Sequence, residues 1–229
     1  MRRLLLVAVI GILLAGPSCG RKSPTSTSYW NENWDFGTNN PNVFVALGDS
    51  VTEGAGDSTF DGCFIGEFEG YPRRLQAKLP SGKRVINEGR CGEGAMHGAQ
   101  RVNSVLAQYK PGYLLILYGY NDRCACQNIM DQLRIIIRAA KANKTIPIIG
   151  TMNGDNPDVE SMNPMIRNLA REEGIIVADI FQAFESDSRY QQDHSALLYG
   201  DSLGLHPNDA GYEVMAQAWY DAIVGNFRL

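Results

Sequence analysis

The sequence has little of three things that would each point to a particular function. Histidine occurs only three times, as His97, His194 and His206, so a histidine-based site has few candidates. Positive charge is not in excess, because the formal net charge is -4, and such a chain has no basic field to hold a phosphate backbone. A phosphate-binding G-x-x-x-x-G-K-[ST] loop and zinc-finger spacing of cysteines or histidines are both missing. These absences argue against a nucleic-acid partner, and nothing in the sequence calls for a metal or an organic cofactor.

Long apolar runs are also missing. The apolar run at 4–15 is too short to span a membrane comfortably, but it follows two arginines and precedes small residues and Cys19. Residues 1–19 therefore have the layout of a signal peptide. They resemble a bacterial lipoprotein signal, in which Cys19 would be lipidated and become the first mature residue; ordinary cleavage nearby is the alternative. Either outcome predicts export to the periplasm or cell envelope, and lipidation predicts attachment to the outer membrane.

The five cysteines are an awkward number for an oxidising compartment, because disulfides use them in pairs. If Cys19 is set aside, the remainder form an even set that suits two disulfides: Cys63, Cys91, Cys124 and Cys126. A bridge between Cys124 and Cys126 would be strained, so we expect each of them to pair with Cys63 or Cys91.

The remaining 210 or so residues have the composition of one soluble globular domain, with 44% hydrophobic and 20% charged residues in the whole chain. Residues 20–41 are rich in Ser, Thr, Asn and Pro without apolar periodicity, which is typical of a tether. Residues 42–229 are expected to form the domain.

Within that domain, short apolar runs alternate with helix-length segments. The runs are rich in β-branched or aromatic residues and suit buried parallel strands: 43–47, 84–87, 113–118, 146–151 and 175–179. Apolar residues recur at helical spacing in two groups, Met130, Leu133, Ile137 and Ala140, and then Tyr212, Met215, Ala216, Trp219 and Ile223. The alternation predicts an α/β sandwich with a mostly parallel, five-stranded sheet and helices on both faces.

Candidate site residues follow the first three of these strands, where ligands bind in such sheets. Ser50 follows the first, Gly89 the second and Asn121 the third. An exposed serine can act as a nucleophile, a glycine can bring its N–H close to a ligand, and an asparagine amide can donate to an oxyanion. Each also has a plainer interpretation, as a turn residue or as part of an Asn121-Asp122 helix cap.

His206 is the best-placed partner for Ser50. Pro207 and Asn208 read as the start of an amphipathic helix, which holds His206 in the loop just before it. His97 suits an ordinary position at a helix start, and His194 lies in a polar segment.

Together these segments resemble the GDS(L)/SGNH hydrolase family over nearly the whole domain. The resemblance is carried by "ALGDSVTEG", "VINEGRCGEG", "GYND" and "GLHPNDAGY", in this order. It implies a flavodoxin-like three-layer α/β/α fold and a serine esterase. By matching position, Ser50 is the nucleophile, His206 the general base, and the oxyanion hole combines the N–H groups of Ser50 and Gly89 with the Asn121 amide. Disulfides between the loop cysteines would then brace that hole.

The chain departs from the family pattern three residues before the histidine. Leu203 stands where an Asp is expected, and a leucine cannot orient an imidazole. Asp201 is our candidate for the third member of the triad, and a Ser–His dyad oriented by a backbone carbonyl is the alternative. The resemblance leaves the substrate open among short-chain acyl esters, lipids, thioesters and acetylated glycans, and it leaves the oligomeric state open as well. The second functional hypothesis is a surface lipoprotein that binds carbohydrate or lipid with a weakened site.

Overall fold

The computed structural model of the protein describes residues 34–59, 69–122, 126–154, 157–200 and 204–229. Five parallel strands form one sheet in the order β2-β1-β3-β4-β5. The strands are β1 Asn40–Gly48, β2 Arg84–Gly89, β3 Pro111–Leu117, β4 Ile146–Gly150 and β5 Ile176–Ala178. This confirms the predicted α/β class and all five strands.

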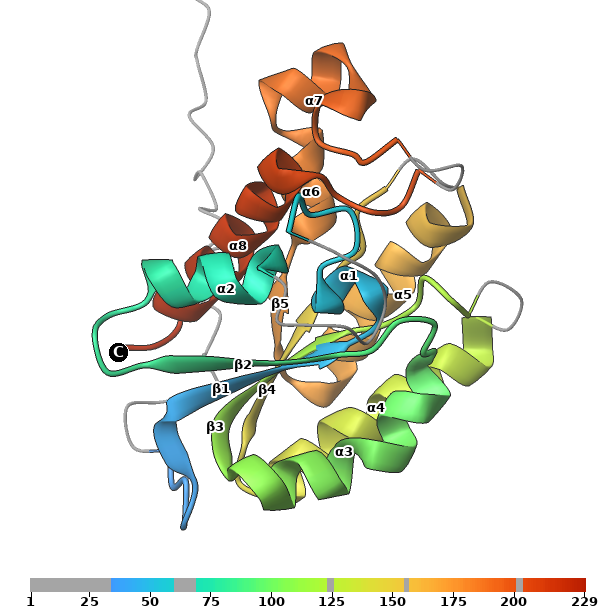
Figure 1. Ribbon diagram of the computed structural model, residues 1–229. Helices are drawn as coiled ribbons and strands as arrows, with labels where there is room; N and C mark the ends of the chain where they lie inside the picture. The colour runs from blue at the N-terminus through green and yellow to red at the C-terminus, as the bar shows by residue number, and fades with distance from the viewer. Residues whose placement is uncertain (1–33, 60–68, 123–125, 155–156, 201–203) are drawn as a thin grey trace, which may run out of the picture.

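Helices cover both faces of the sheet, as Figure 1 shows. The main helices are α2 Gly70–Lys78, α3 Ala95–Tyr109, α4 Cys126–Ala142, α5 Pro157–Glu173 and α8 Asp209–Val224. On one face α3 packs against α4 and α4 against α5, while α2 packs against α8 on the other. Shorter segments are α1 Ser50–Glu53, α6 Ile180–Glu185, α7 Ser188–Gln192 and the 3-10 turn His194–Ala196.

The core lies between these layers, and its composition explains the strand pattern. Every residue of β3 and of β4 is buried, which is why their sequences are continuously apolar instead of alternating. The two helical sets predicted from spacing are buried as well, with Leu133 and Ile137 on α4 and Trp219 on α8 fully inaccessible.

The strand β2 forms one edge of the sheet and is only partly buried. Side chains occupy two of its outward N–H groups: Val85 donates to Gln76 Oε1 at 2.6 Å, and Gly89 donates to Asn87 Oδ1 at 2.9 Å. The amide of Gln76 in turn donates to the carbonyl of Lys83 at 2.8 Å.

The segment before the first strand is attached to the domain at 34–39. Trp34 and Phe36 pack against the core, and the Trp34 indole N–H donates to the Lys144 carbonyl at 3.1 Å. Strand β1 begins at Asn40, three residues before the predicted run, because Asn40 donates its N–H to the Lys110 carbonyl at 2.8 Å. No helix within the described ranges combines the length and apolar character needed to cross a bilayer.

The strand order fixes where a ligand would bind. Connections leave β1 toward one face and β2 and β3 toward the other, so the loops after β1 and β3 separate at the carboxyl end of the sheet. Such a switch point forms a crevice outside the strand ends. Ser50 follows β1 directly at this crevice.

Candidate functional site

Ser50 is the first residue of α1, immediately beyond the end of β1. Asp49 caps this helix, because its Oδ1 accepts the N–H of Val51 at 3.0 Å. The cap turns the chain sharply at Ser50, whose side chain stays close to the surface although the residue is only 8% exposed. The N–H of Ser50 has no acceptor among the described residues, so it can donate to a ligand.

Asp49 itself is fully buried beneath this turn. Burial raises the pKa of its carboxyl to about 8, and the N–H of Val51 opposes the rise only in part. Its second oxygen, Oδ2, has no hydrogen-bond partner within the described part of the chain. Burial thus favours the protonated form of Asp49, and within the described part of the chain its carboxyl caps α1 and makes no hydrogen bond with His206.

His206 lies beside Ser50 although 156 residues separate them in sequence. Its Nε2 is 3.0 Å from Ser50 Oγ, the distance at which an imidazole can accept a serine proton. Gly56 makes this approach possible, because a Cβ there would lie 2.4 Å from the Pro207 carbonyl oxygen and 3.1 Å from His206 Cβ.

Neutral hydrogen bonds hold the loop that carries His206. The buried Asn153 donates from Nδ2 to the Leu205 carbonyl at 3.1 Å and accepts the Tyr120 hydroxyl at 2.7 Å. The carbonyl of His206 accepts the N–H of Tyr199 at 2.8 Å. On the far side Asn208 caps α8, as predicted, by accepting the N–H of Gly211 at 3.0 Å.

Asn121 lies at the turn after β3 and is exposed. Its amide Nδ2 donates one hydrogen to the Glu93 carbonyl at 2.9 Å, which leaves its second hydrogen for a ligand. The capping role belongs to Asp122, whose carboxylate accepts the N–H of Ala95 at 2.9 Å and so caps α3 rather than the helix that follows.

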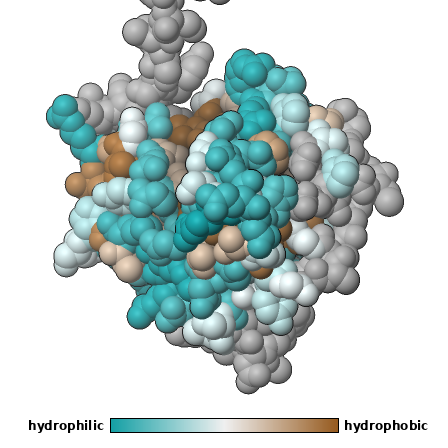
Figure 2. All heavy atoms as spheres, turned by 90° about the horizontal axis from the view of Figure 1, so that it is seen from above, coloured by the Kyte–Doolittle hydropathy of each residue, from teal (hydrophilic) through white to brown (hydrophobic). Residues whose placement is uncertain are grey.

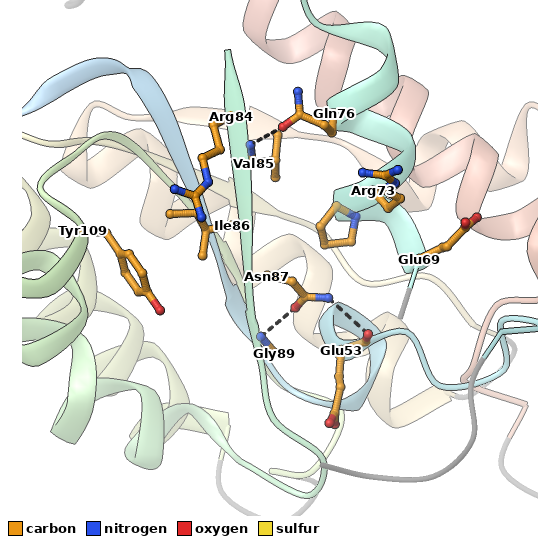
Figure 3. Close-up of a pocket in the computed structure, with 11 residues that line it drawn as sticks. Glu53, Glu69, Arg73, Gln76, Arg84, Val85, Ile86, Asn87, Gly89 and Tyr109 are labelled. Carbon is orange, nitrogen blue, oxygen red and sulfur yellow. Dashed lines mark hydrogen bonds between the residues drawn. The ribbon is translucent and has the colours of Figure 1, made fainter. Parts of the chain in front are cut away.

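Gly89 does not direct its N–H toward Ser50. In a parallel strand successive N–H groups point to opposite sides, and Arg90 donates to the Gly48 carbonyl of β1 at 3.0 Å. The N–H of Gly89 therefore faces the open edge of the sheet, where Asn87 accepts it, as the dashed line in Figure 3 shows. The oxyanion role expected of Gly89 does not fit this geometry.

The loop after β2 nevertheless contains one free donor. From Arg90 to Ala95 the N–H groups find an acceptor in a neighbouring carbonyl or side chain, with one exception. That exception is Gly92, whose N–H has no acceptor among the described residues. Gly92 is exposed and has φ +75°, a backbone conformation that glycine adopts readily. The sequence pattern did not distinguish it from the other glycines of this loop.

The structure describes the other two histidines and Cys91, whereas the remaining predicted candidates lie outside the described residues. His97 Nδ1 accepts the N–H of Gly94 at 3.1 Å at the start of α3, which confirms its ordinary role at a helix start. His194 stacks on Tyr190 with ring centroids 4.2 Å apart. Cys91 is disulfide-bonded. The other cysteine side chains, together with Asp201 and Leu203, lie outside the described part, so the disulfide pairing and the third triad residue stay predictions.

A pocket of about 810 Å³ lies along the open edge of β2 and is drawn in Figure 3. Its lining is mostly polar and comes from α1, α2, β2 and the end of α3, and it includes neither Ser50 nor His206. Within the described residues, no cluster of His, Cys, Asp or Glu side chains could hold a metal ion. This pocket is therefore distinct from the site at Ser50.

Comparison with known proteins agrees with this arrangement. The model of the GDSL-like lipase/acylhydrolase family matches residues 46–214, and a comparison with curated proteins finds no significant match. An alpha/beta hydrolase enzyme from the metagenome of Lake Arreo, Spain, superposes with a TM-score of 0.66 at 23% identity, covering 83% of this chain and 98% of that one.

Two further solved structures share the fold. A lipase/acylhydrolase from Enterococcus faecalis has a TM-score of 0.65 at 20% identity, over 81% of this chain and 97% of that one. An acetylxylan esterase from Geobacillus stearothermophilus has a TM-score of 0.64 at 21% identity, over 80% and 94%. With its parallel sheet, its Ser50–His206 contact and the family match over most of its length, the chain belongs to the GDSL-like lipase/acylhydrolase family and is a carboxylic ester hydrolase.

Proposed function

We propose that the protein hydrolyses esters through an acyl-enzyme formed on Ser50, with His206 as general base. The observation that carries this proposal is the 3.0 Å contact between Ser50 Oγ and His206 Nε2. A neutral serine hydroxyl is a weak nucleophile until an adjacent base removes its proton, and the histidine is at the distance required. Both residues lie at the switch point of the sheet, where a substrate can reach them.

Three donors serve the oxyanion in this proposal: the N–H groups of Ser50 and Gly92 and the second hydrogen of the Asn121 amide. Each lacks an acceptor among the described residues, which supports their assignment. Gly92 takes the place that the sequence suggested for Gly89, whose N–H is held by Asn87. Preorganised donors of this kind stabilise the negative charge that develops on the carbonyl oxygen.

The reaction then proceeds in two halves. Ser50 Oγ attacks the acyl carbon while His206 takes its proton, and the imidazolium returns that proton to the departing alcohol. Water next attacks the acyl-enzyme with His206 again accepting the proton, which releases the acid and restores Ser50. We keep Asp201 as the candidate that orients the imidazole, with a Ser–His dyad as the alternative; unchanged kinetics in Asp201→Ala would favour the dyad.

For the substrate we propose a small acyl group, such as acetyl, on a polar alcohol. Figure 2 shows a largely hydrophilic face with scattered apolar residues instead of one broad apolar surface. Tyr199, which is 54% exposed, adjoins His206 and offers a flat ring to a sugar or similar leaving group. An esterase of acetylated xylan shares the fold, which is consistent with this class.

The test of the nucleophile is labelling with a fluorophosphonate probe, which reacts with activated serines. We expect labelling of the wild type and none of Ser50→Ala, while Ser104→Ala, an exposed serine on α3, labels normally. Hydrolysis of p-nitrophenyl acetate should follow the same pattern. Equal labelling of Ser50→Ala and wild type would refute the assignment, and no labelling of the wild type would favour a protein that only binds its ligand.

We also propose that the enzyme is exported and that disulfides brace the loops around the oxyanion hole. The signal-like segment 1–19 supports export, and the disulfide of Cys91, one residue before Gly92, supports the bracing. Mass spectrometry of the mature N-terminus decides between a lipidated Cys19 and ordinary cleavage. Non-reducing peptide mapping identifies the cysteine that pairs with Cys91.

A further inference from the structure

Arg101 on α3 is a largely buried cation at the carboxyl end of the sheet. Its side chain is 11% exposed, and its guanidinium forms ion pairs with Glu88 at 2.9 Å and with Glu93 at 2.8 Å. Nη2 also donates to the Glu88 carbonyl at 2.6 Å and to the Gly48 carbonyl at 3.3 Å. A helix arginine with this many internal partners is not a solvated surface residue.

The same guanidinium reaches the end of a third strand. Nη2 donates to the hydroxyl of Tyr118 at 2.9 Å, and that hydroxyl donates to Glu93 Oε2 at 3.1 Å. Gly48, Glu88 and Tyr118 stand at the ends of β1, β2 and β3 respectively. The loops that leave these three strand ends carry the three donors assigned above to the oxyanion hole.

Glu93 connects Arg101 to one of these donors directly. Its carboxylate accepts from Arg101 Nε, while its backbone carbonyl accepts the Asn121 amide at 2.9 Å. The position of the Asn121 side chain therefore depends on the position of Glu93. The position of Glu93 depends in turn on Arg101, because a planar guanidinium donates in fixed directions to several acceptors at once.

We propose that Arg101 is the positioning residue of the oxyanion hole, acting on Asn121 through Glu93. This inference rests on the proposed function, because it presupposes that Asn121 serves the oxyanion. Arg101 touches neither Ser50 nor the substrate in this scheme; it holds Glu93, and the Glu93 carbonyl holds the Asn121 side chain. Displacement of an oxyanion donor raises the barrier of the chemical step and leaves ground-state binding largely unchanged.

The experiment is a double-mutant cycle between Arg101→Met and Asn121→Ala, read as kcat and KM for p-nitrophenyl acetate. Methionine keeps the length of the side chain and removes its donors. We expect Arg101→Met to lower kcat by about tenfold to a hundredfold with KM nearly unchanged. The double variant should be no slower than Asn121→Ala alone, because both substitutions disable the same donor.

Two further variants separate positioning from stability. Arg134→Met removes a comparable set of ion pairs to Asp131, Glu172 and Glu173 on the outer helices and should leave kcat unchanged. Arg101→Lys keeps the positive charge but lacks the planar guanidinium that donates to several acceptors at once. Compared with Arg101→Met, it should therefore recover more of the thermal stability than of the kcat. If Arg101→Met does not fold, Glu93→Gln replaces it in the cycle, since it weakens the ion pair and keeps the carbonyl.

The outcomes are distinct. If the kcat losses of Arg101→Met and Asn121→Ala multiply in the double variant, Arg101 does not act through Asn121. That result overturns the inference about Arg101 and leaves the proposed function standing. If Asn121→Ala leaves kcat unchanged, the oxyanion role of Asn121 in the proposed function fails, and the inference fails with it.

Discussion

The two sides of the active site are held in place by different kinds of interaction. On the oxyanion side, charged groups dominate: Arg101 is paired with Glu88 and Glu93 around the strand ends. On the histidine side, the contacts that the described residues make are neutral: Asn153 joins Tyr120 to the carbonyl just before His206. The first arrangement is partly open to solvent, and the second is buried.

This difference follows from what each side must do. In the proposed mechanism the oxyanion side binds a charge that appears only during the reaction, and its Asn121 donor is held through Glu93 by a multidentate cation, Arg101. On the histidine side, the neutral contacts hold the backbone of the loop that carries His206, and the orientation of the imidazole itself is left to another group, for which Asp201 is our candidate. The predictions below test whether the two sides contribute independently.

The largest effect is expected from His206→Ala, which removes the base and leaves the oxyanion side intact. We expect kcat for p-nitrophenyl acetate to fall by about four to six orders of magnitude, with an unchanged circular dichroism spectrum. The residual rate should still exceed that of water by roughly 10³-fold, because the oxyanion donors remain. A variant that keeps a tenth of the wild-type kcat would exclude His206 as the base.

A smaller effect is expected from Asn153→Ala, which weakens the support of the histidine side. The carbonyl of Leu205 loses its donor, and buried groups left without a partner cost about 1–3 kcal/mol of stability. The displaced loop should also lower kcat by about tenfold. Thermal unfolding and kcat are the two measurements.

Asn163→Ala is the matched control, because Asn163 is equally buried and its side chain, among the described residues, bonds only to the backbone of Met152. It should lose similar stability and keep kcat at temperatures well below its unfolding midpoint. Equal kcat losses in Asn153→Ala and Asn163→Ala would show that Asn153 stabilises the fold but has no specific role in positioning His206.

The smallest effect on activity is expected from Asp49→Asn, which tests the buried carboxyl between the two sides. Burial raises the folded-state pKa of Asp49 to about 8, whereas it is about 3.9 in an unfolded chain. Unfolding therefore releases a proton from about pH 4 to pH 8, and the free energy of unfolding contributed by Asp49 decreases as the pH rises through this range. Below pH 4 this contribution is fully present.

Asparagine is neutral at every pH and caps a helix as well as aspartate does. Urea unfolding of Asp49→Asn should therefore show a flatter decline of stability between pH 4 and pH 8 than the wild type, with kcat nearly unchanged. If the free energy of unfolding falls with pH equally in Asp49→Asn and in the wild type, Asp49 is ionised in the folded protein.

The sequence predicted the fold and the proximity of Ser50 and His206, for physical reasons. Parallel strands buried on both faces must be continuously apolar, so β3 and β4 stand out in the sequence. Strand ends in such a sheet converge on one edge, which brought Ser50 and Asn121 to the same region. With only three histidines, His206 was identified largely by its position before a helix start.

The second backbone donor was harder to predict. Three glycines follow one another closely in the loop after β2, and nothing in the residue types separates them. Only the direction of each N–H does so. Because Arg90 bonds to β1, the N–H of Gly89 faces the edge of the sheet, whereas the N–H of Gly92, in the loop beyond the strand, has no acceptor among the described residues.

Arg101 and Glu93 were missed for a related reason. A charged residue on an amphipathic helix usually faces solvent, and sequence spacing does not show that three strand ends converge on it. The third triad residue and the disulfide pairing depend on Asp201 and on cysteine side chains outside the described residues, and they remain predictions.

The two amides at the open edge of β2 have a consequence for how copies of the enzyme meet. The side chains of Gln76 and Asn87 accept the N–H groups of Val85 and Gly89. Without them, the carbonyl groups of an added strand could accept these N–H groups. A second chain could extend the sheet here only after displacing both side chains. At high protein concentration, this edge should therefore resist aggregation by strand addition.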